Sequence, residues 1–463
     1  MLRKNVVIIL LIVVISILAG VANAQNPALS IKDCIQIALK NNSELKNADR
    51  RTRLAGTGVT MARAEILPSL GVSLSSNRAY QSPQGPYLQE IPIQDPVTGQ
   101  VTLVQQNIFL DSYYRNSFSS GASLNQMIFD GGKWFYRIKQ ANAGYNSAEL
   151  NYHAIRAQVI ALVTQHYYDL LKGIKLQEVY EKAVESAQEQ LKKTESMYEI
   201  GSVAQADVFR ARVNLGTEQM NLIQQRNIVA MNRADLNLAL GWDVNHAIEI
   251  LGEDLTIEPL QLTKEEVWNL VEEHNPSLKS LAENLKGDQY GIKIAKGNFL
   301  PQINLNASYG RYHTNFNKLY DPFDKNYSFS GRLSISWNLF NGMADAAGVE
   351  QASLNYHIDK ENLLQNKLSL KNDAEQAYLS YKAYEEIEKI NEDNLKSAEE
   401  DLRLSQERYR IGAGTLLEVI DAQVSLTRAR ATLITTKYNR LIVLVQLYNN
   451  AGILEDKLKS VME

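Results

Sequence analysis

The sequence contains two copies of one unit, and this duplication restricts the possible folds more than any other feature. An offset of 233 residues pairs Asn42 with Asn275, and an offset of 211 residues pairs Gly201 with Gly412 further along. The offsets differ by 22 residues, which predicts one insertion in the first copy. A period of about 200 residues is too long for an ordinary solenoid. The chain is therefore expected to be a protomer with internal pseudo-twofold symmetry.

Residues 1–24 have the features of a secretory signal peptide. Two basic residues precede an apolar run from Val6 to Ala19, and Ala22-Asn23-Ala24 supplies the small residues that a signal peptidase needs. No later stretch approaches the ~20 apolar residues of a membrane-spanning helix. The two copies in the mature chain are then expected to span residues 25–258 and 259–463.

Each copy predicts the same order of elements. A helical stretch ends at Leu-Pro, because proline lacks a backbone donor and its predecessor prefers extended geometry. Apolar and polar residues then alternate with a period of two, which indicates strands. The helical stretches are Ser30–Glu65 and Lys264–Asn298, and the strands are about 69–82, 114–129, 302–313 and 327–340.

A very long helical segment follows the second strand of each copy. Gly132–Tyr198 and Met343–Tyr409 each have 67 residues without proline, which corresponds to about 100 Å of helix. Their apolar positions recur in steps of three and four, as in coiled coils. The chain is expected to turn at Gly201 and Gly412, after which a shorter helix returns.

The predicted strands are suited to a membrane. Their apolar residues alternate with Ser, Asn and Gly, and aromatic residues lie near their ends, which is typical of outer-membrane barrels. A soluble sheet is the alternative, but four strands offer little sheet to bury. Four strands cannot close a barrel, and open edges in lipid leave backbone groups unpaired, so several chains must share one barrel.

The insertion lies between Pro83 and Ser112, in the connection between the first two predicted strands. It contains Pro-Gln-Gly-Pro and Asp-Pro-Val-Thr-Gly, which mark turns. We therefore expect a long polar loop. Long barrel loops lie on the outer side of the membrane, so this loop is expected to face the cell exterior.

Several short motifs, in this order, resemble TolC-type outer membrane efflux proteins over nearly the whole mature chain. They are Leu-Pro before each first strand, Phe-Asp-Gly-Gly and Phe-Asn-Gly after each second strand, and Tyr-Glu-Ile-Gly and Tyr-Arg-Ile-Gly at the helical turns. The resemblance implies a homotrimer in the outer membrane of a Gram-negative bacterium. Each chain would contribute four strands to a shared barrel in the outer-membrane lipid and its helices to a shared periplasmic tunnel.

The same resemblance implies the function of a passive exit channel in a tripartite efflux or type I secretion system. Such a channel docks on a periplasmic adaptor protein and an inner-membrane pump. The helical turns would form the docking tip for the adaptor, with Gly201, Ser202, Gly412 and Ala413 at its centre. Each glycine can also simply end a helix in left-handed geometry.

Four residues fall where the family places its periplasmic gate. They are Asp207, Tyr409, Glu418 and Asp421, with a proposed hydrogen bond from the Tyr409 hydroxyl to Asp207. Gly414 stands where well-known members of the family carry an arginine, which implies a looser resting gate. Alternatively, Glu418 and Asp421 only solvate the first turns of a helix and favour its positive end.

No constellation of residues indicates catalysis, a cofactor or a metal. Cys34 is the single cysteine, and the sequence has no HExxH pattern, phosphate-binding glycine loop or nucleophile elbow. With 48 Lys and Arg against 52 Asp and Glu, nothing predicts a nucleic-acid partner.

A second hypothesis without enzymatic activity is a periplasmic coiled-coil scaffold or adaptor without a pore, which would not need the four alternating strands.

Overall fold

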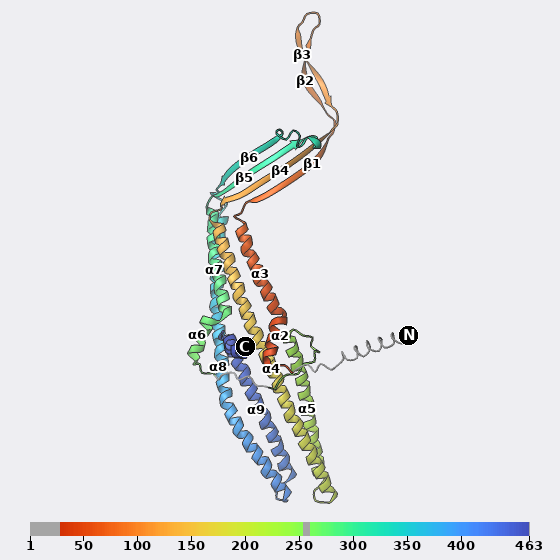
Figure 1. Cartoon of the computed structure of the whole chain (residues 1–463), viewed down its shortest axis with the longest axis vertical. Coiled ribbons are helices and arrows are strands. Elements are labelled where there is room, and N and C mark those ends of the chain that lie inside the picture. The colour runs from red at the N-terminus through yellow and green to blue at the C-terminus, as the bar shows by residue number, and fades with distance from the viewer. Residues whose placement is uncertain (1–27, 253–259, 463) are drawn as a thin grey trace, which may run out of the picture. The chain divides into compact units, whose positions relative to one another are not determined.

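The computed structural model describes residues 28–252 and 260–462 (Figure 1). The predicted signal peptide and the predicted boundary at residue 258 lie outside them. The described residues form two compact units. The helical unit comprises residues 28–55, 144–252, 260–285 and 358–462, and the sheet unit comprises residues 56–143 and 286–357.

The two copies have the same order of helices and strands. In the first copy these are α2 (Ile31–Asn41), α3 (Ser43–Ala64), β1 (Ser69–Gln81), β4 (Tyr113–Phe129), α4 (Lys133–Glu199) and α5 (Gln205–Leu240). In the second they are α6 (Lys264–His274), α7 (Pro276–Lys296), β5 (Gln302–His313), β6 (Tyr327–Ser336), α8 (Ala344–Arg410) and α9 (Leu416–Asn450), followed by α10 (Leu454–Met462). The helices α4 and α8 have 67 residues each, the length expected from the sequence.

The first helical stretch of each copy is broken in two, which the sequence analysis did not predict. The breaks lie at Asn42 and Asn275, which the repeat pairs with each other. Each side-chain oxygen accepts two backbone N–H groups from the first turn of the following helix. Each side-chain amide donates to a carbonyl near the end of the return helix of its copy, Ala239 O at 3.4 Å and Asn450 O at 2.9 Å. Equivalent asparagines therefore form two equivalent joints.

Five of the 23 tyrosines are among the buried residues of the main core of the helical unit. The largest fully buried side chains include Tyr167, Tyr168, Tyr381 and Tyr448. They pack with leucines from the C-terminal parts of the return helices α5 and α9. A smaller cluster of buried residues lies at the turns between the long and the return helices.

The sheet unit contains an antiparallel sheet in the order β1-β4-β5-β6. Alternate side chains such as Leu70, Val72 and Leu74 on β1, and Leu333 and Ile335 on β6, are exposed. Serines alternate with them, and Ser75 and Ser119 form a hydrogen bond across two strands. The observed strands have the apolar and polar alternation predicted from the sequence. Within the described residues, no helix is both long and apolar enough to span a membrane.

Two details of the strands differ from the predictions. The segment 83–112 is not a long loop, because β2 (Gln84–Gln94) and β3 (Val101–Leu110) pair there as an antiparallel hairpin. The apolar and β-branched residues on both sides of the Asp95 turn favour strands over a loop. The predicted strand 327–340 ends at Ser336, and the Trp337 indole N–H donates to the carbonyl of Phe299 at 3.0 Å.

The connection between β5 and β6 is organised by one buried cation. Arg311 is 2% exposed, and its guanidinium lies 4.4 Å from the centre of the Phe323 ring. It donates to the carbonyls of Lys325, Leu319 and Phe323, the first at 3.2 Å. A single side chain thus binds three backbone groups of residues 314–326, which the several N–H donors of a guanidinium allow.

Replacing Arg311 by leucine is expected to release this connection. The change leaves three carbonyls without their donor, the Leu319 carbonyl at a buried residue, at a local cost of about 3 kcal/mol. Limited proteolysis should then cut the purified protein between residues 314 and 326, where the unchanged protein resists. Arg332→Leu, at an exposed position on β6, is the matched control. Equal resistance of both variants would contradict the role of Arg311.

Candidate functional site

The two turns at the tip of the helical unit have the same backbone structure. Gly201 and Gly412 have φ values of 73° and 75°. The next residues, Ser202 and Ala413, donate their N–H groups to carbonyls five positions earlier, both at 2.8 Å. Such bonds end a helix in a Schellman motif. No atom lies within 4 Å of a Cβ built on either glycine, so backbone conformation alone requires glycine there.

Both turns expose a large apolar side chain. Ile200 is 80% exposed and Ile411 is 65% exposed, and they precede the two glycines. Ser202 and Ala413 are also exposed. The predicted docking residues therefore lie on the surface of the helical unit, next to apolar groups that the chain itself does not cover.

Tyr409 packs into the tip. It is 8% exposed and belongs to a cluster with Ala211, Leu416 and Val419. The ring thereby joins α5, α8 and α9. Tyr409 thus has a structural role in the core of the tip.

The Tyr409 hydroxyl does not form the bond that the sequence analysis proposed. It donates to Met197 Sδ at 3.7 Å and is also hydrogen-bonded with Thr194. Asp207 lies beside its own helix partner Arg210, at 3.7 Å between Oδ1 and Nη1. Burial raises the pKa of the Tyr409 hydroxyl, and the charge of Asp207 raises it further. The hydroxyl therefore remains a protonated donor at neutral pH.

The two carboxylates of the predicted gate differ in their surroundings. Glu418 Oε2 lies 3.3 Å from Arg408 Nη1, whereas exposed Asp421 has no ionic or hydrogen-bonding partner in the described part of the chain. The Glu418 N–H also donates to Thr415 Oγ1 at 3.3 Å, so that Thr415 caps α9. The negative charge of Glu418 thus lies at the positive end of the α9 dipole, as the alternative interpretation holds. Glu418 and Asp421 are three residues apart and share one face of the helix.

Gly414 is tightly packed beside the ion pair of Arg408 and Glu418. A Cβ there would lie 3.1 Å from Arg408 Cβ and 3.2 Å from Glu418 Oε2. A larger residue would therefore require Arg408 or Glu418 to shift. The chain lacks an arginine at position 414 but places the guanidinium of Arg408 against Glu418, a partner that the sequence analysis missed. The Arg-Tyr-Arg-Ile-Gly sequence before the turn was the available signal.

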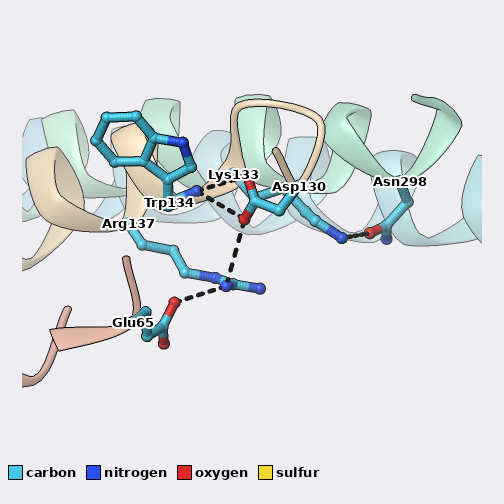
Figure 2. A network of polar contacts seen from close by, with 6 residues as sticks. All are labelled: Glu65, Asp130, Lys133, Trp134, Arg137 and Asn298. Carbon is cyan, nitrogen blue, oxygen red and sulfur yellow. Dashed lines mark hydrogen bonds and ion pairs between the residues drawn. The ribbon is translucent and has the colours of Figure 1, made fainter. Parts of the chain in front are cut away.

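A second polar cluster lies where β4 ends and α4 begins, and Figure 2 shows its members. Asp130 is 3% exposed and accepts the Trp134 N–H at 2.9 Å. Arg137 lies between Asp130, at 3.7 Å, and Glu65, at 2.7 Å. Buried Lys133 donates to Asn298 Oδ1 at 3.0 Å. We refer to these residues as the junction network.

Glycines make the junction network possible. Gly131 and Gly132 have φ values of 78° and 77°. A Cβ on Gly131 would lie 2.3 Å from the carbonyl oxygen of Gly297, whereas a Cβ on Gly132 would touch nothing. The Phe-Asp-Gly-Gly motif therefore combines a buried carboxylate with close backbone contact. In the second copy, Asn341 replaces the aspartate and accepts the Asp345 N–H at 3.3 Å.

Comparison with known proteins decides the family. The model of the outer membrane efflux protein family matches residues 34–242 and 267–452, one segment for each copy. The chain belongs to the outer membrane efflux protein family. It is a TolC-type outer membrane factor, and the expected mixed fold with long helices, a four-stranded sheet and a two-fold repeat is confirmed, as is the outer-membrane localisation.

Individual relatives agree with this family. The chain is 23% identical over 439 residues to the probable efflux pump outer membrane protein TtgC of Pseudomonas putida, covering 92% of this chain and 83% of that protein. It is 24% identical over 454 residues to the outer membrane protein TolC of Escherichia coli, covering 93% and 83%. The solved CmeC outer membrane channel of Campylobacter jejuni has the same fold, with a TM-score of 0.78 at 20% identity, covering 93% and 88%.

The family consists of channel proteins, which favours a function without catalysis. The described residues contain no group of three or more His, Cys, Asp or Glu that could hold a metal ion. Burial raises the pKa of the Cys34 thiol to about 12, so this side chain is a core residue rather than a nucleophile.

Proposed function

We propose that three copies of this chain form a passive exit duct of the outer membrane, which receives cargo from a periplasmic adaptor and an inner-membrane pump. The observation that carries the proposal is the sheet β1-β4-β5-β6, whose alternate side chains are apolar and exposed. Within the described chain, β1 and β6 each pair on one side only. Pairing β6 with β1 of the next copy would supply the missing backbone bonds and close a barrel of shared strands.

The proposal is tested on the purified protein. Light scattering in detergent should give three chains per particle, and planar bilayers should show discrete conductance steps. The protein should also remain with outer membranes after extraction with carbonate. Recovery of a soluble periplasmic protein without conductance would favour the coiled-coil scaffold and contradict the duct.

We propose further that Ile200, Ile411 and the residues beside them form the docking tip for the adaptor. Exposed apolar side chains at two equivalent turns support this, because such groups usually mark an interaction site. The two turns present the same backbone and the same isoleucine. The tip thus offers two similar sites per chain to one repeated element of a partner.

Asp421 is the gate carboxylate on which cation binding should depend. Three copies would bring three unpaired Asp421 side chains toward one axis, whereas each Glu418 is already paired with Arg408. Asp421→Asn is therefore expected to weaken the block of single-channel current by multivalent cations by about tenfold, or 1.4 kcal/mol. Glu418→Gln, the matched control, should change it much less. The reverse order would contradict this assignment.

A further inference from the structure

The hairpin of β2 and β3 has no counterpart in the second copy and exposes apolar side chains on both faces. Figure 1 shows it extending beyond the four-stranded sheet of the same unit. Leu88 and Leu103 are 70% and 64% exposed on one face, and Ile93 and Val104 are 51% and 45% exposed on the other. An isolated two-stranded hairpin is only marginally stable in water. Its structure and its apolar surface therefore indicate a partner.

The two outer edges of the hairpin differ in their capacity to pair. The strand β2 contains Pro86 and Pro92, which lack an N–H group, and the charged residue Glu90. Prolines and charges prevent the addition of another strand at an edge. The strand β3, Val101–Leu110, contains neither proline nor charge over ten residues. In the part of the chain that the structure describes, β3 pairs with β2 alone. Only the β3 edge is therefore open to a further strand.

The sequence of β3 is complementary to itself when two copies run antiparallel about Gln106. In this register Gln106 faces Gln106 of the other copy, and Gln105 faces Asn107. Val104 then faces Ile108, and Leu103 faces Phe109. Amides meet amides at the centre and apolar side chains meet on both flanks, which are favourable cross-strand pairs.

The strand β2 extends this pattern across the hairpin. Gln89 lies opposite Gln106, and Ile91 lies opposite Val104. Two paired hairpins would thus place four glutamines in one row across four strands, with apolar residues beside them. The hairpin's carboxylates, Glu90 and Asp95, lie on β2 and in the turn, away from the β3 edge. No like charges therefore face each other at the contact.

We propose that β3 is an interaction surface for a second copy of this chain, through antiparallel β3–β3 pairing centred on Gln106. The contact is twofold and closes on itself. A trimer with threefold symmetry contains no twofold axis, so the second copy must belong to another trimer. This step rests on the proposed function. Pairing of β3 with β2 inside one trimer is opposed by Pro86 and Pro92.

Disulfide formation tests the register directly. Directly opposed residues have Cα atoms about 4.5–5.5 Å apart, within the range of a disulfide. The purified Gln106→Cys protein should form covalent chain pairs on mild oxidation. Gln105→Cys alone should not, but a mixture of Gln105→Cys and Asn107→Cys proteins should. The native cysteine, Cys34, is fully buried and serves as the background control.

Particle mass gives an independent readout. Light scattering of the detergent-solubilised protein should show twice the mass of a trimer. Val104→Lys should halve that mass, because it places a charge in the contact, whereas Leu88→Lys on β2 should leave it unchanged.

Two results would overturn the proposal. One is a particle of a single trimer in the unchanged protein. The other is a disulfide that joins a Gln106→Cys chain to a Gln89→Cys chain in oxidised trimers of the two co-expressed variants, which would show that β3 pairs with β2 of the neighbouring chain. Neither result would alter the conductance steps, so failure of the pairing is distinguishable from failure of the duct.

Discussion

Replacing Gly131 by alanine is expected to destabilise the protein far more than replacing its neighbour Gly132. Both residues have the same left-handed backbone, which costs alanine about 1–2 kcal/mol. Only at Gly131 would the new Cβ lie 2.3 Å from the Gly297 carbonyl oxygen, so either the chain at Gly297 or the junction network must move. The total loss should reach about 3–5 kcal/mol.

The thermal unfolding midpoint of the purified protein measures this difference. Gly132→Ala is a matched control, since it has equal backbone strain and no steric contact. Asp130→Asn gives a second comparison, because it keeps the shape of the side chain and removes the charge beside Arg137. Equal midpoints for the two glycine variants would show that the close contact with Gly297 does not restrict the junction.

Tryptophan at both Ser202 and Ala413 is expected to abolish efflux while the channel still assembles. Both positions are exposed and follow the glycines, so the bulky side chains should leave the turns intact and block docking. A partner interface that loses its central contacts typically loses 2 kcal/mol or more, about thirtyfold in affinity. Cells carrying the double variant should accumulate a fluorescent pump substrate.

Two controls separate docking from folding. The double variant should show unchanged conductance in planar bilayers, because docking is not needed there. Asn245→Trp adds the same side chain at an exposed loop position of the helical unit and should leave efflux intact. Normal efflux by the double variant would reject the docking tip and leave the glycines a structural role alone.

Periodicity predicted the main elements well, because it is a local property of the chain. The proline-free segments became α4 and α8, and the alternating segments became strands of one sheet. The breaks at Asn42 and Asn275 were not predicted, since a lone asparagine within a helical pattern does not reveal its cap. The hairpin was not predicted because turn residues flank and interrupt the segment 83–112, whereas its β-branched and aromatic residues are interspersed with polar ones, as in Val101–Leu110.

The candidate site was less predictable, since its contacts join residues distant in the sequence. The bond from Tyr409 to Met197 and the contact of Gly131 with Gly297 depend on how helices pack. Position 414 lacks the arginine of well-known family members, and Arg408, six positions earlier, forms an ion pair with Glu418 that the sequence did not reveal. Family resemblance assigned the gate residues, but it could not describe their partners in this chain.

The asparagine joints have a mechanical consequence. Each return helix is anchored near its C-terminal end by a hydrogen bond that one of its carbonyls accepts from the side-chain amide of Asn42 or Asn275. Close packing of Gly241 or Gly452 on the neighbouring backbone holds the same end. Its other end begins at the exposed tip, about 50 Å of helix away. A pull at the tip therefore acts on a helix that is held by the core and by an asparagine joint at its far end, and each chain has two such helices of 36 and 35 residues.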